Sequence, residues 1–158
     1  TYILNLMKKV IGFLAVIAVF ATVAFSFTTD DKKVIESAKD EVKEIKFSGL
    51  SYADALKLSK QTGKLIFIDC YTVWCGPCKY LSNTTFKDPL VAEFFNSNFI
   101  NLKVEMEKDA DGPELGRLFK VRGYPTMLFL NEKGELIQQV YGYADAKQLM
   151  NVATTVIK

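Results

Sequence analysis

The sequence contains no histidine among its 158 residues. Nucleophile activation by Ser-His-Asp or Cys-His arrangements is therefore excluded, and so is zinc proteolysis through a His-Glu-x-x-His helix. Glycine and proline are scarce, with 9 and 4 residues, while hydrophobic residues make up 49% of the chain. This globular composition excludes collagen-like, largely disordered and disulfide-rich scaffold proteins. The length suffices for one domain with an extension, but not for two cores.

Acidic residues are absent from the first 29 positions, which contain the basic residues Lys8 and Lys9. In the remaining chain, 18 Lys and Arg residues balance 18 Asp and Glu residues. A nucleic-acid-binding protein normally carries a basic excess on one face. We therefore expect no nucleic-acid partner.

Residues 7–27 have the pattern of an export signal. Lys8 and Lys9 precede eighteen uncharged residues, and Ala24 and Ser26 provide small residues at a position suited to signal peptidase. An uncleaved membrane anchor is the alternative, because about 18 apolar residues is near the lower limit for spanning a bilayer. A buried core helix fits poorly, since the segment has no polar face. We predict export, with the membrane contacted only through this segment. Residues 28–44 are charge-rich and predict a linker or an N-terminal helix.

Residues 45–158 alternate helical and strand patterns. Predicted strands cover residues 65–71, 99–104, 126–130 and 136–140. Predicted helices cover residues 52–62, about 75–83, a stretch through 91–95, a short segment from Pro113, and a last segment ending near residue 157. We expect Leu115, Leu118 and Phe119 to face inward from the short helix, and Leu149, Val152, Ala153, Val156 and Ile157 from the last one. This order predicts an α/β fold with a central mixed β-sheet and helices on both faces.

Two cysteines, Cys75 and Cys78, follow the strand 65–71 and open the next helix. In this context a Cys-x-x-Cys pair indicates a redox dithiol. Unpaired N–H groups and the positive end of the helix dipole favour a thiolate at Cys75. Lowering a thiol pKa from about 8.5 to about 7 requires only ~2 kcal/mol, so no imidazole is needed. Pro77 suits the first helical turn, and Cys78 lies one turn on, where its sulfur can attack a mixed disulfide at Cys75.

A static structural disulfide and half of a zinc site are the alternatives for this pair. A disulfide across so short a loop removes little entropy from the unfolded chain. Zinc would need two further ligands, and only Cys70 and carboxylates remain. We therefore predict a redox-active disulfide, no metal and no other cofactor. Cys70 itself is predicted to be a small buried residue. Within the acidic stretch from Glu105 to Pro125, a pattern that starts at Glu107 resembles the first half of a calcium loop. Leu118 occupies its twelfth position, where an acid is required, so we expect a solvated loop without calcium.

Three features in this order resemble thioredoxin: Trp74 to Cys78, Asp69 in an apolar strand six residues before Cys75, and Gly123-Tyr124-Pro125-Thr126 before a strand. The resemblance covers about residues 45–158. Its finer pattern is similar to exported bacterial thioredoxin-like domains, including the periplasmic carboxy-terminal domain of the transmembrane thiol–disulfide interchange protein. It implies the thioredoxin fold, and a periplasmic or other extracytoplasmic location in which the protein is secreted or anchored in the inner membrane.

The resemblance also implies a role for each residue of the site. Cys75 would be the attacking thiolate, Cys78 the resolving thiol, and Asp69 the buried carboxylate that accepts the Cys78 proton. Pro125 would follow a cis peptide bond and place Tyr124 backbone groups beside an extended substrate strand; an ordinary trans proline is the alternative. The remaining motif and docking residues would be Trp74, Gly76, Pro77 and Thr126.

Independently of the resemblance, an acid in an apolar strand should be desolvated, with its pKa raised, unless it caps the strand in water. Asn101 and Lys103 are both candidates for a polar neighbour of this acid, Asp69, and the sequence does not choose between them.

The dipeptide Gly76-Pro77 resembles the reducing members of the family, with potentials near about −270 mV. We therefore predict a thiol–disulfide oxidoreductase that reduces protein disulfides outside the cytosol. Its expected partners are disulfide-bearing proteins and a membrane thiol electron donor, because that compartment is oxidising and the chain has no nucleotide-binding glycine motif. Two alternatives remain open: a binding or chaperone module that uses the Pro125 groove, and an oxidase or isomerase whose direction is set by its partner.

Overall fold

The computed structural model describes residues 44–157. The predicted signal or anchor at 7–27, and the linker or helix at 28–44 apart from its last residue, lie outside the described residues. Among residues 44–157, no helix is both long enough and apolar enough to cross a bilayer.

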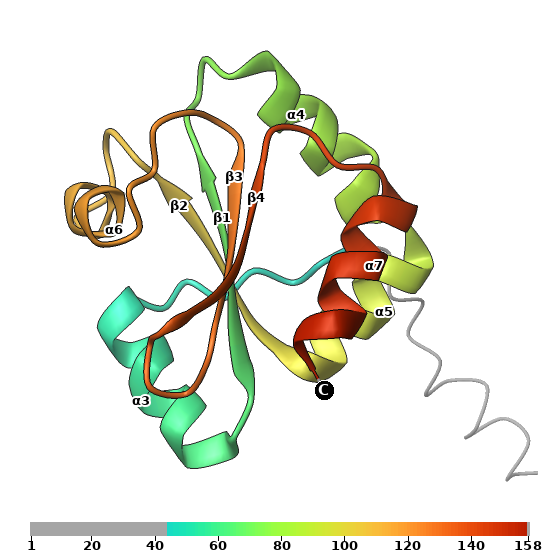
Figure 1. Ribbon diagram of the computed structural model, residues 1–158. Helices are drawn as coiled ribbons and strands as arrows, with labels where there is room; N and C mark the ends of the chain where they lie inside the picture. Colours follow the sequence, from blue (N-terminus) through green and yellow to red (C-terminus); the bar gives the residue numbers. More distant parts are fainter. Residues whose placement is uncertain (1–43, 158) are drawn as a thin grey trace, which may run out of the picture. The chain divides into compact units, whose positions relative to one another are not determined.

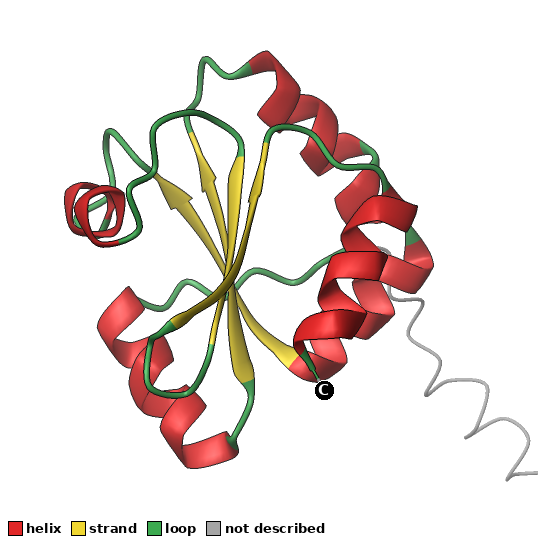
Figure 2. Ribbon diagram, in the orientation of Figure 1, coloured by secondary structure: helices red, strands yellow, loops and turns green. Residues whose placement is uncertain are grey.

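A four-stranded sheet forms the centre of the domain (Figures 1 and 2). Its strand order is β2-β1-β3-β4, with the strands β1 (Leu65–Tyr71), β2 (Phe99–Glu105), β3 (Thr126–Leu130) and β4 (Leu136–Tyr141). Strand β1 pairs parallel with β2 and antiparallel with β3, and β3 pairs antiparallel with β4. The predicted mixed sheet is therefore confirmed, and each predicted strand matches to within one residue.

Helices cover both faces of this sheet, as predicted (Figure 1). One face carries α4 (Gly76–Asn83), α5 (Pro89–Asn98) and α7 (Ala146–Val156), with the short 3-10 helix η1 (Thr85–Lys87) between the first two. The other face carries α3 (Tyr52–Thr62) and α6 (Gly112–Leu118).

Alternation along β1 assigns its side chains to the two layers. Phe67 lies in the α4–α5–α7 core, where its ring contacts Phe95 at 4.7 Å and Phe129 at 5.2 Å between centroids. Ile66 and Ile68 lie in the α3–α6 core. Because successive side chains point to opposite faces of a strand, Asp69 lies on the same face as Phe67 and faces the helix that carries the two cysteines.

The short helix α6 corrects one predicted contact. Leu115 and Phe119 are buried, as expected, but Leu118 is 51% exposed. A helix of seven residues presents one narrow face to the sheet, and positions four apart share that face while position 118 turns away from it. In the last helix, Ile157 was also predicted to face inward. It is exposed, because α7 ends at Val156 and the inward-facing row of apolar side chains ends with the helix.

The acidic stretch from Glu105 to Pro125 was predicted to be a solvated loop, and this prediction is only partly confirmed. Residues 107–110 are exposed, but Glu105 completes β2 and is buried, as is Met106. The helix α6 occupies Gly112–Leu118, close to the short helix predicted from Pro113. Gly112 packs against the backbone of Met106, where an added Cβ would lie 2.4 Å from the Met106 carbonyl oxygen, so this helix start requires glycine.

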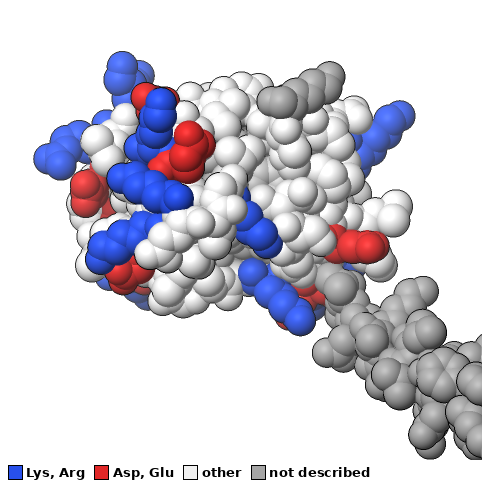
Figure 3. All heavy atoms as spheres, turned by 90° about the horizontal axis from the view of Figure 1, so that it is seen from below, with Lys and Arg blue, Asp and Glu red and all other residues white. Residues whose placement is uncertain are grey.

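Charged side chains at the lower end of the domain have mixed signs. Figure 3 shows Lys and Arg gathered mostly on one side of this face, with Asp and Glu among them. This face therefore does not present a continuous basic surface.

The last helix begins with a capping box. The Asp145 carboxylate accepts from the backbone N–H of Gln148 at 2.8 Å, and the Gln148 side chain accepts from the Asp145 N–H at 2.9 Å. We expect Asp145→Ala to lower the free energy of unfolding by about 1 kcal/mol, because one terminal N–H loses its acceptor. Urea unfolding with an unchanged slope would show this. Asp145→Asn keeps an acceptor and serves as the control; an equal loss in both variants would contradict the capping explanation.

Candidate active site

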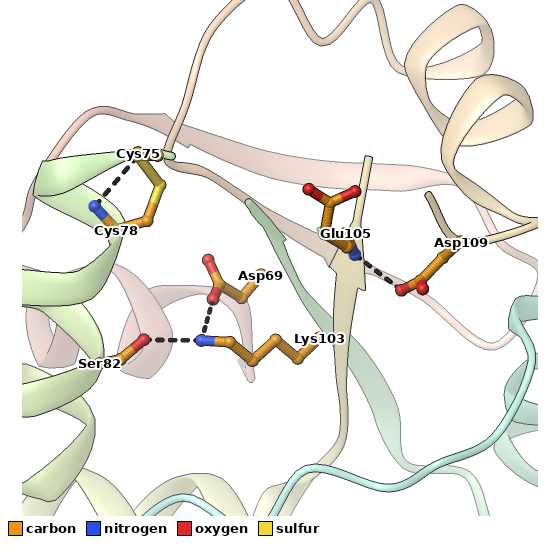
Figure 4. Close-up of polar contacts among 7 residues, drawn as sticks. All are labelled: Asp69, Cys75, Cys78, Ser82, Lys103, Glu105 and Asp109. Carbon is orange, nitrogen blue, oxygen red and sulfur yellow. Dashed lines mark hydrogen bonds and ion pairs between the residues drawn. A yellow bond between two sulfur atoms is a disulfide. The ribbon is translucent and has the colours of Figure 1, made fainter. Parts of the chain in front are cut away.

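Cys75 and Cys78 form a disulfide at the start of α4 (Figure 4). Cys75 is the N-cap residue, in an extended backbone conformation, and Cys78 lies in the first turn behind Gly76 and Pro77. The two cysteines are only 3% and 2% exposed, whereas Gly76 and Pro77 are exposed. The predicted placement of the cysteine pair at a helix amino terminus is therefore confirmed.

Backbone hydrogen bonds hold Cys75, one of them to its sulfur. The Cys78 N–H donates to Cys75 Sγ at 3.1 Å, and the Cys75 N–H donates to the Thr72 carbonyl oxygen at 3.1 Å, which closes a turn over residues 72–75. When the disulfide is reduced, the Cys78 N–H and the positive end of the α4 dipole are placed to stabilise a Cys75 thiolate.

Asp69 lies buried below the disulfide, between β1 and α4 (Figure 4). Its Oδ2 accepts from Lys103 Nζ at 2.9 Å, and Lys103 Nζ also donates to Ser82 Oγ of α4 at 2.6 Å. Asp69 and Lys103 are direct partners in the parallel register of β1 and β2. The structure thus decides the open choice of polar neighbour in favour of Lys103.

Asn101 has a different function in the fold. It is buried, and its amide group donates to the carbonyl oxygens of Lys46 and Phe95 and to the side chain of Asn96. It therefore ties the extended segment 44–48 to the edge of the sheet, where Ser48 forms a bridge with Leu102.

Aromatic rings enclose the Lys103 ammonium group. It lies 4.7 Å from the ring centroid of Tyr71, 5.2 Å from that of Phe47 and 5.4 Å from that of Phe86. The cation is held by ring faces, by Ser82 and by one oxygen of Asp69, so its position is fixed from several sides.

Burial raises the pKa of the Asp69 carboxyl, and the charge and hydrogen bond of Lys103 only partly oppose this effect. The second oxygen, Oδ1, is buried without a hydrogen-bond partner. A carboxylate in this environment binds a proton more readily than one in water. Asp69 is therefore desolvated with a raised pKa, as expected for an acid in an apolar strand.

A pocket of about 370 Å³ opens beside this group. Its lining is formed by Tyr71, Thr72, Val73, Cys78, Lys79, Ser82, Asn83 and Lys103. The pocket brings solvent to the walls formed by Cys78 and Lys103, while Asp69 lies behind them without exposure.

An aromatic surface borders the disulfide. Trp74 is 63% exposed, its ring meets that of Tyr124 edge-on at 5.9 Å, and its indole N–H donates to Glu107 at 3.0 Å. The peptide bond between Tyr124 and Pro125 is cis, as predicted. Thr126 is buried, and its hydroxyl donates to the Gly123 carbonyl oxygen at 2.7 Å, so its side chain holds the turn rather than facing a partner.

Two further contacts at this surface were not predicted from the sequence. Tyr80 of α4 and Tyr143 of the β4–α7 loop are both exposed, and their rings contact each other at a tilt of 44°, with centroids 5.1 Å apart. Glu105 at the end of β2 accepts from the N–H of Val73, two residues before Cys75, at 3.0 Å. The sequence shows that both tyrosines exist, but their exposure and pairing depend on the tertiary fold.

Cys70 is buried and free, as predicted. Burial, together with the nearby Asp69 charge, raises its pKa far above the ordinary range, so it stays a neutral thiol. Within residues 44–157, no group of three or more Cys, Asp or Glu side chains is placed to hold a metal ion.

Residues 52–157 match the family model of the thioredoxin-like domain. The chain is 36% identical over 98 residues to the thiol:disulfide interchange protein DsbD of Actinobacillus pleuropneumoniae serotype 5b (strain L20), which covers 60% of this chain and 17% of the relative. It is 34% identical over 95 residues to Thioredoxin-1 of Drosophila melanogaster, covering 60% and 81% of the two chains. A Bacteroides thetaiotaomicron protein proposed to be a disulphide-isomerase has a solution structure that aligns with a TM-score of 0.64 and 46% identity, covering 72% of this chain and 94% of that one. This chain spans under a fifth of the length of the DsbD relative.

Proposed function

The chain belongs to the thioredoxin-like family, and we propose that it reduces disulfides of other proteins, outside the cytosol, through the Cys75–Cys78 dithiol. One observation carries this proposal. The disulfide lies at the amino terminus of α4, where the Cys78 N–H donates a hydrogen bond to Cys75 Sγ, and the buried carboxyl of Asp69, whose pKa is raised, lies beneath it.

The proposed reaction has two exchange steps. The Cys75 thiolate attacks one sulfur of the substrate disulfide, forms a mixed disulfide and releases the other substrate sulfur as a thiolate. Cys78 then loses its proton to Asp69 and attacks Cys75 Sγ. This closes the Cys75–Cys78 disulfide and releases the second substrate thiolate. Two electrons pass from the dithiol to the substrate, and the released thiolates take up protons from solvent.

The surroundings of the two sulfurs support this order of events. The exposed residues Trp74, Gly76 and Pro77 flank Cys75 in the chain, and we place the incoming disulfide on them. Cys78 lies in the first turn of α4 and lines the pocket beside Lys103. Trp74, Tyr124 and the Pro125 turn provide the surface on which we place an extended substrate segment.

The direction and place of the reaction rest on the sequence. Gly76-Pro77 favours the reducing direction, and the export pattern at 7–27 favours a periplasmic or other extracytoplasmic location. A protein that reduces disulfides there must be reduced in turn, and we propose a membrane thiol donor. The likeness to part of an interchange protein supports that choice.

The Bacteroides thetaiotaomicron relative favours disulfide isomerisation as a second candidate function. An isomerase must release its substrate before resolution completes, so its potential should be higher than that of a reductase. The equilibrium with glutathione separates the two: a potential near about −270 mV supports reduction, whereas one near about −180 mV supports isomerisation.

The test of the proposed function is covalent trapping with Cys78→Ser. Without the resolving thiol, we expect mixed disulfides through Cys75 to accumulate and to disappear on adding dithiothreitol. Cys70→Ser, which removes a buried free thiol, is the matched control and should trap nothing. If Cys78→Ser traps no protein while its Cys75 still reacts with iodoacetamide, the chain is a binding or chaperone module with a static disulfide.

A further inference from the structure

Two acids from the end of β2 hold the turn that leads into Cys75. The turn covers residues 72–75, and its central residues are Val73 and Trp74. The Val73 N–H donates to Glu105 Oε1 at 3.0 Å, and the Trp74 indole N–H donates to Glu107 Oε2 at 3.0 Å. The Met106 N–H also donates to the Tyr71 carbonyl oxygen at 2.9 Å, so residues 105, 106 and 107, at the end of β2 and just after it, all bind the segment before the cysteines.

Glu105 differs from Glu107 because both oxygens of its carboxylate accept hydrogen bonds from backbone N–H groups. Oε1 accepts from Val73, and Oε2 accepts from the Glu107 N–H at 2.9 Å. Its own N–H donates to Asp109 at 2.7 Å (Figure 4). The residue is only 3% exposed. A buried carboxylate that bridges two loops in this way fixes their relative position.

Electrostatics keep this bridge ionised at neutral pH. Burial by itself raises the pKa of Glu105, but the backbone N–H groups of Val73, Glu107 and Lys108, together with the Lys108 charge, outweigh it, and the pKa lies below its usual value. The charged form therefore makes both hydrogen bonds under the conditions of the reaction.

We propose that Glu105 is a positioning residue for Cys75: its carboxylate holds the 72–75 turn, and with it the attacking sulfur, at the mouth of α4 when the disulfide is open. This inference rests on the proposed function and adds a residue that acts through the backbone rather than on the sulfur itself.

The contribution of Glu105 should depend on the redox state. In the oxidised protein the covalent Cys75–Cys78 link already restrains the turn. In the dithiol and in the mixed disulfide that link is absent, and Cys75 is held by its N–H bond to Thr72, by the Cys78 N–H and by Glu105 acting through Val73. Removing the carboxylate should therefore destabilise the reduced form more than the oxidised form.

The test is the equilibrium of the full chain with glutathione, in which the dithiol and one glutathione disulfide give the protein disulfide and two glutathione thiols. We expect Glu105→Met, which removes both acceptors, to shift this equilibrium about tenfold toward the protein disulfide, the size of one charge-assisted hydrogen bond. Glu105→Gln keeps one acceptor and should shift it less, in the same direction. It also serves as the measurable variant if Glu105→Met does not fold.

The control is Glu107→Gln, which removes an equal charge from the same loop but leaves the Val73 bond intact. Loss of a negative charge near a thiolate favours the reduced form, so a purely electrostatic effect has the opposite sign. The proposal is overturned if Glu105 variants shift the equilibrium toward the dithiol, or if urea unfolding shows the same loss in both redox states. Neither measurement depends on a protein substrate, so failure of the trapping experiment would remain a separate result.

Discussion

Asp69→Asn is expected to slow release of the reduced substrate about a hundredfold at neutral pH, the lower range for loss of a general base. In the proposed second step, Cys78 must lose its proton before it attacks the mixed disulfide. Asp69 is the buried carboxyl beneath the pair, and asparagine cannot accept that proton. The first step, attack by Cys75, should change much less because the Cys78 N–H and the helix terminus remain.

The same variant should be more stable than the wild type at neutral and alkaline pH. Burial raises the pKa of Asp69, so the folded state binds this proton more tightly than the unfolded state does. The contribution of Asp69 to the stability of the wild type therefore falls as the pH rises from its pKa in the unfolded chain, about 3.9, through its raised pKa in the folded protein. Above that pH the contribution stays low. Asparagine carries no charge to bury, so the excess free energy of unfolding of Asp69→Asn over the wild type should grow with pH over that interval and vanish in acid.

Two measurements check this pair of effects. Stopped-flow release from a preformed Cys75 mixed disulfide gives the rate of the second step, and urea unfolding at several pH values gives the stability difference. Asp54→Asn, which removes a charge from exposed α3, is the control and should affect neither the rate nor its pH profile. A wild-type release rate in Asp69→Asn would show that Asp69 is not the proton acceptor. A variant less stable than the wild type above neutral pH would contradict the raised pKa of Asp69.

Local sequence signals were sufficient for much of the fold. The run from Leu65 to Tyr71 has no alternation because β1 is buried on both faces between β2 and β3. Cys75 followed by Gly76-Pro77 predicts an N-cap because proline fits only the first helical turn. These assignments depend on neighbours within a few residues, and they are confirmed.

The polar neighbour of Asp69 and the burial of Glu105 depend on residues far apart in the chain, unlike the local errors at Leu118 and Ile157. Lys103 pairs with Asp69 because of the register between β1 and β2, and a shift of two residues would have placed Asn101 there. Glu105 lies in a stretch so acidic that we predicted a solvated loop. The structure buries Glu105, and two N–H groups satisfy its carboxylate, of which that of Val73 comes from another loop. Side-chain chemistry thus identified the candidate redox pair, while the tertiary fold determines what surrounds it.

Lys103→Met should have the opposite effect on stability from Asp69→Asn. The methionine chain can keep the contacts with the Tyr71, Phe47 and Phe86 rings, but it removes the charge that holds down the pKa of Asp69. Breaking a buried ion pair costs about 3–5 kcal/mol. We expect about 2 kcal/mol here because Lys103 is partly exposed and Asp69 can escape the penalty by binding a proton.

The double variant Asp69→Asn with Lys103→Met isolates the interaction between the two charges. Because the loss in Lys103→Met comes from an unpaired buried carboxylate, removing that carboxylate should recover most of it at pH 7, and the two single effects should not add. The loss should also shrink as pH falls through the raised pKa of Asp69, since both proteins then hold a neutral carboxyl. In the release assay, a higher Asp69 pKa should move the pH profile of the second step upward. Additive single effects, or a loss that persists unchanged in acid, would mean that Lys103 stabilises the domain through its rings and Ser82 rather than through Asp69.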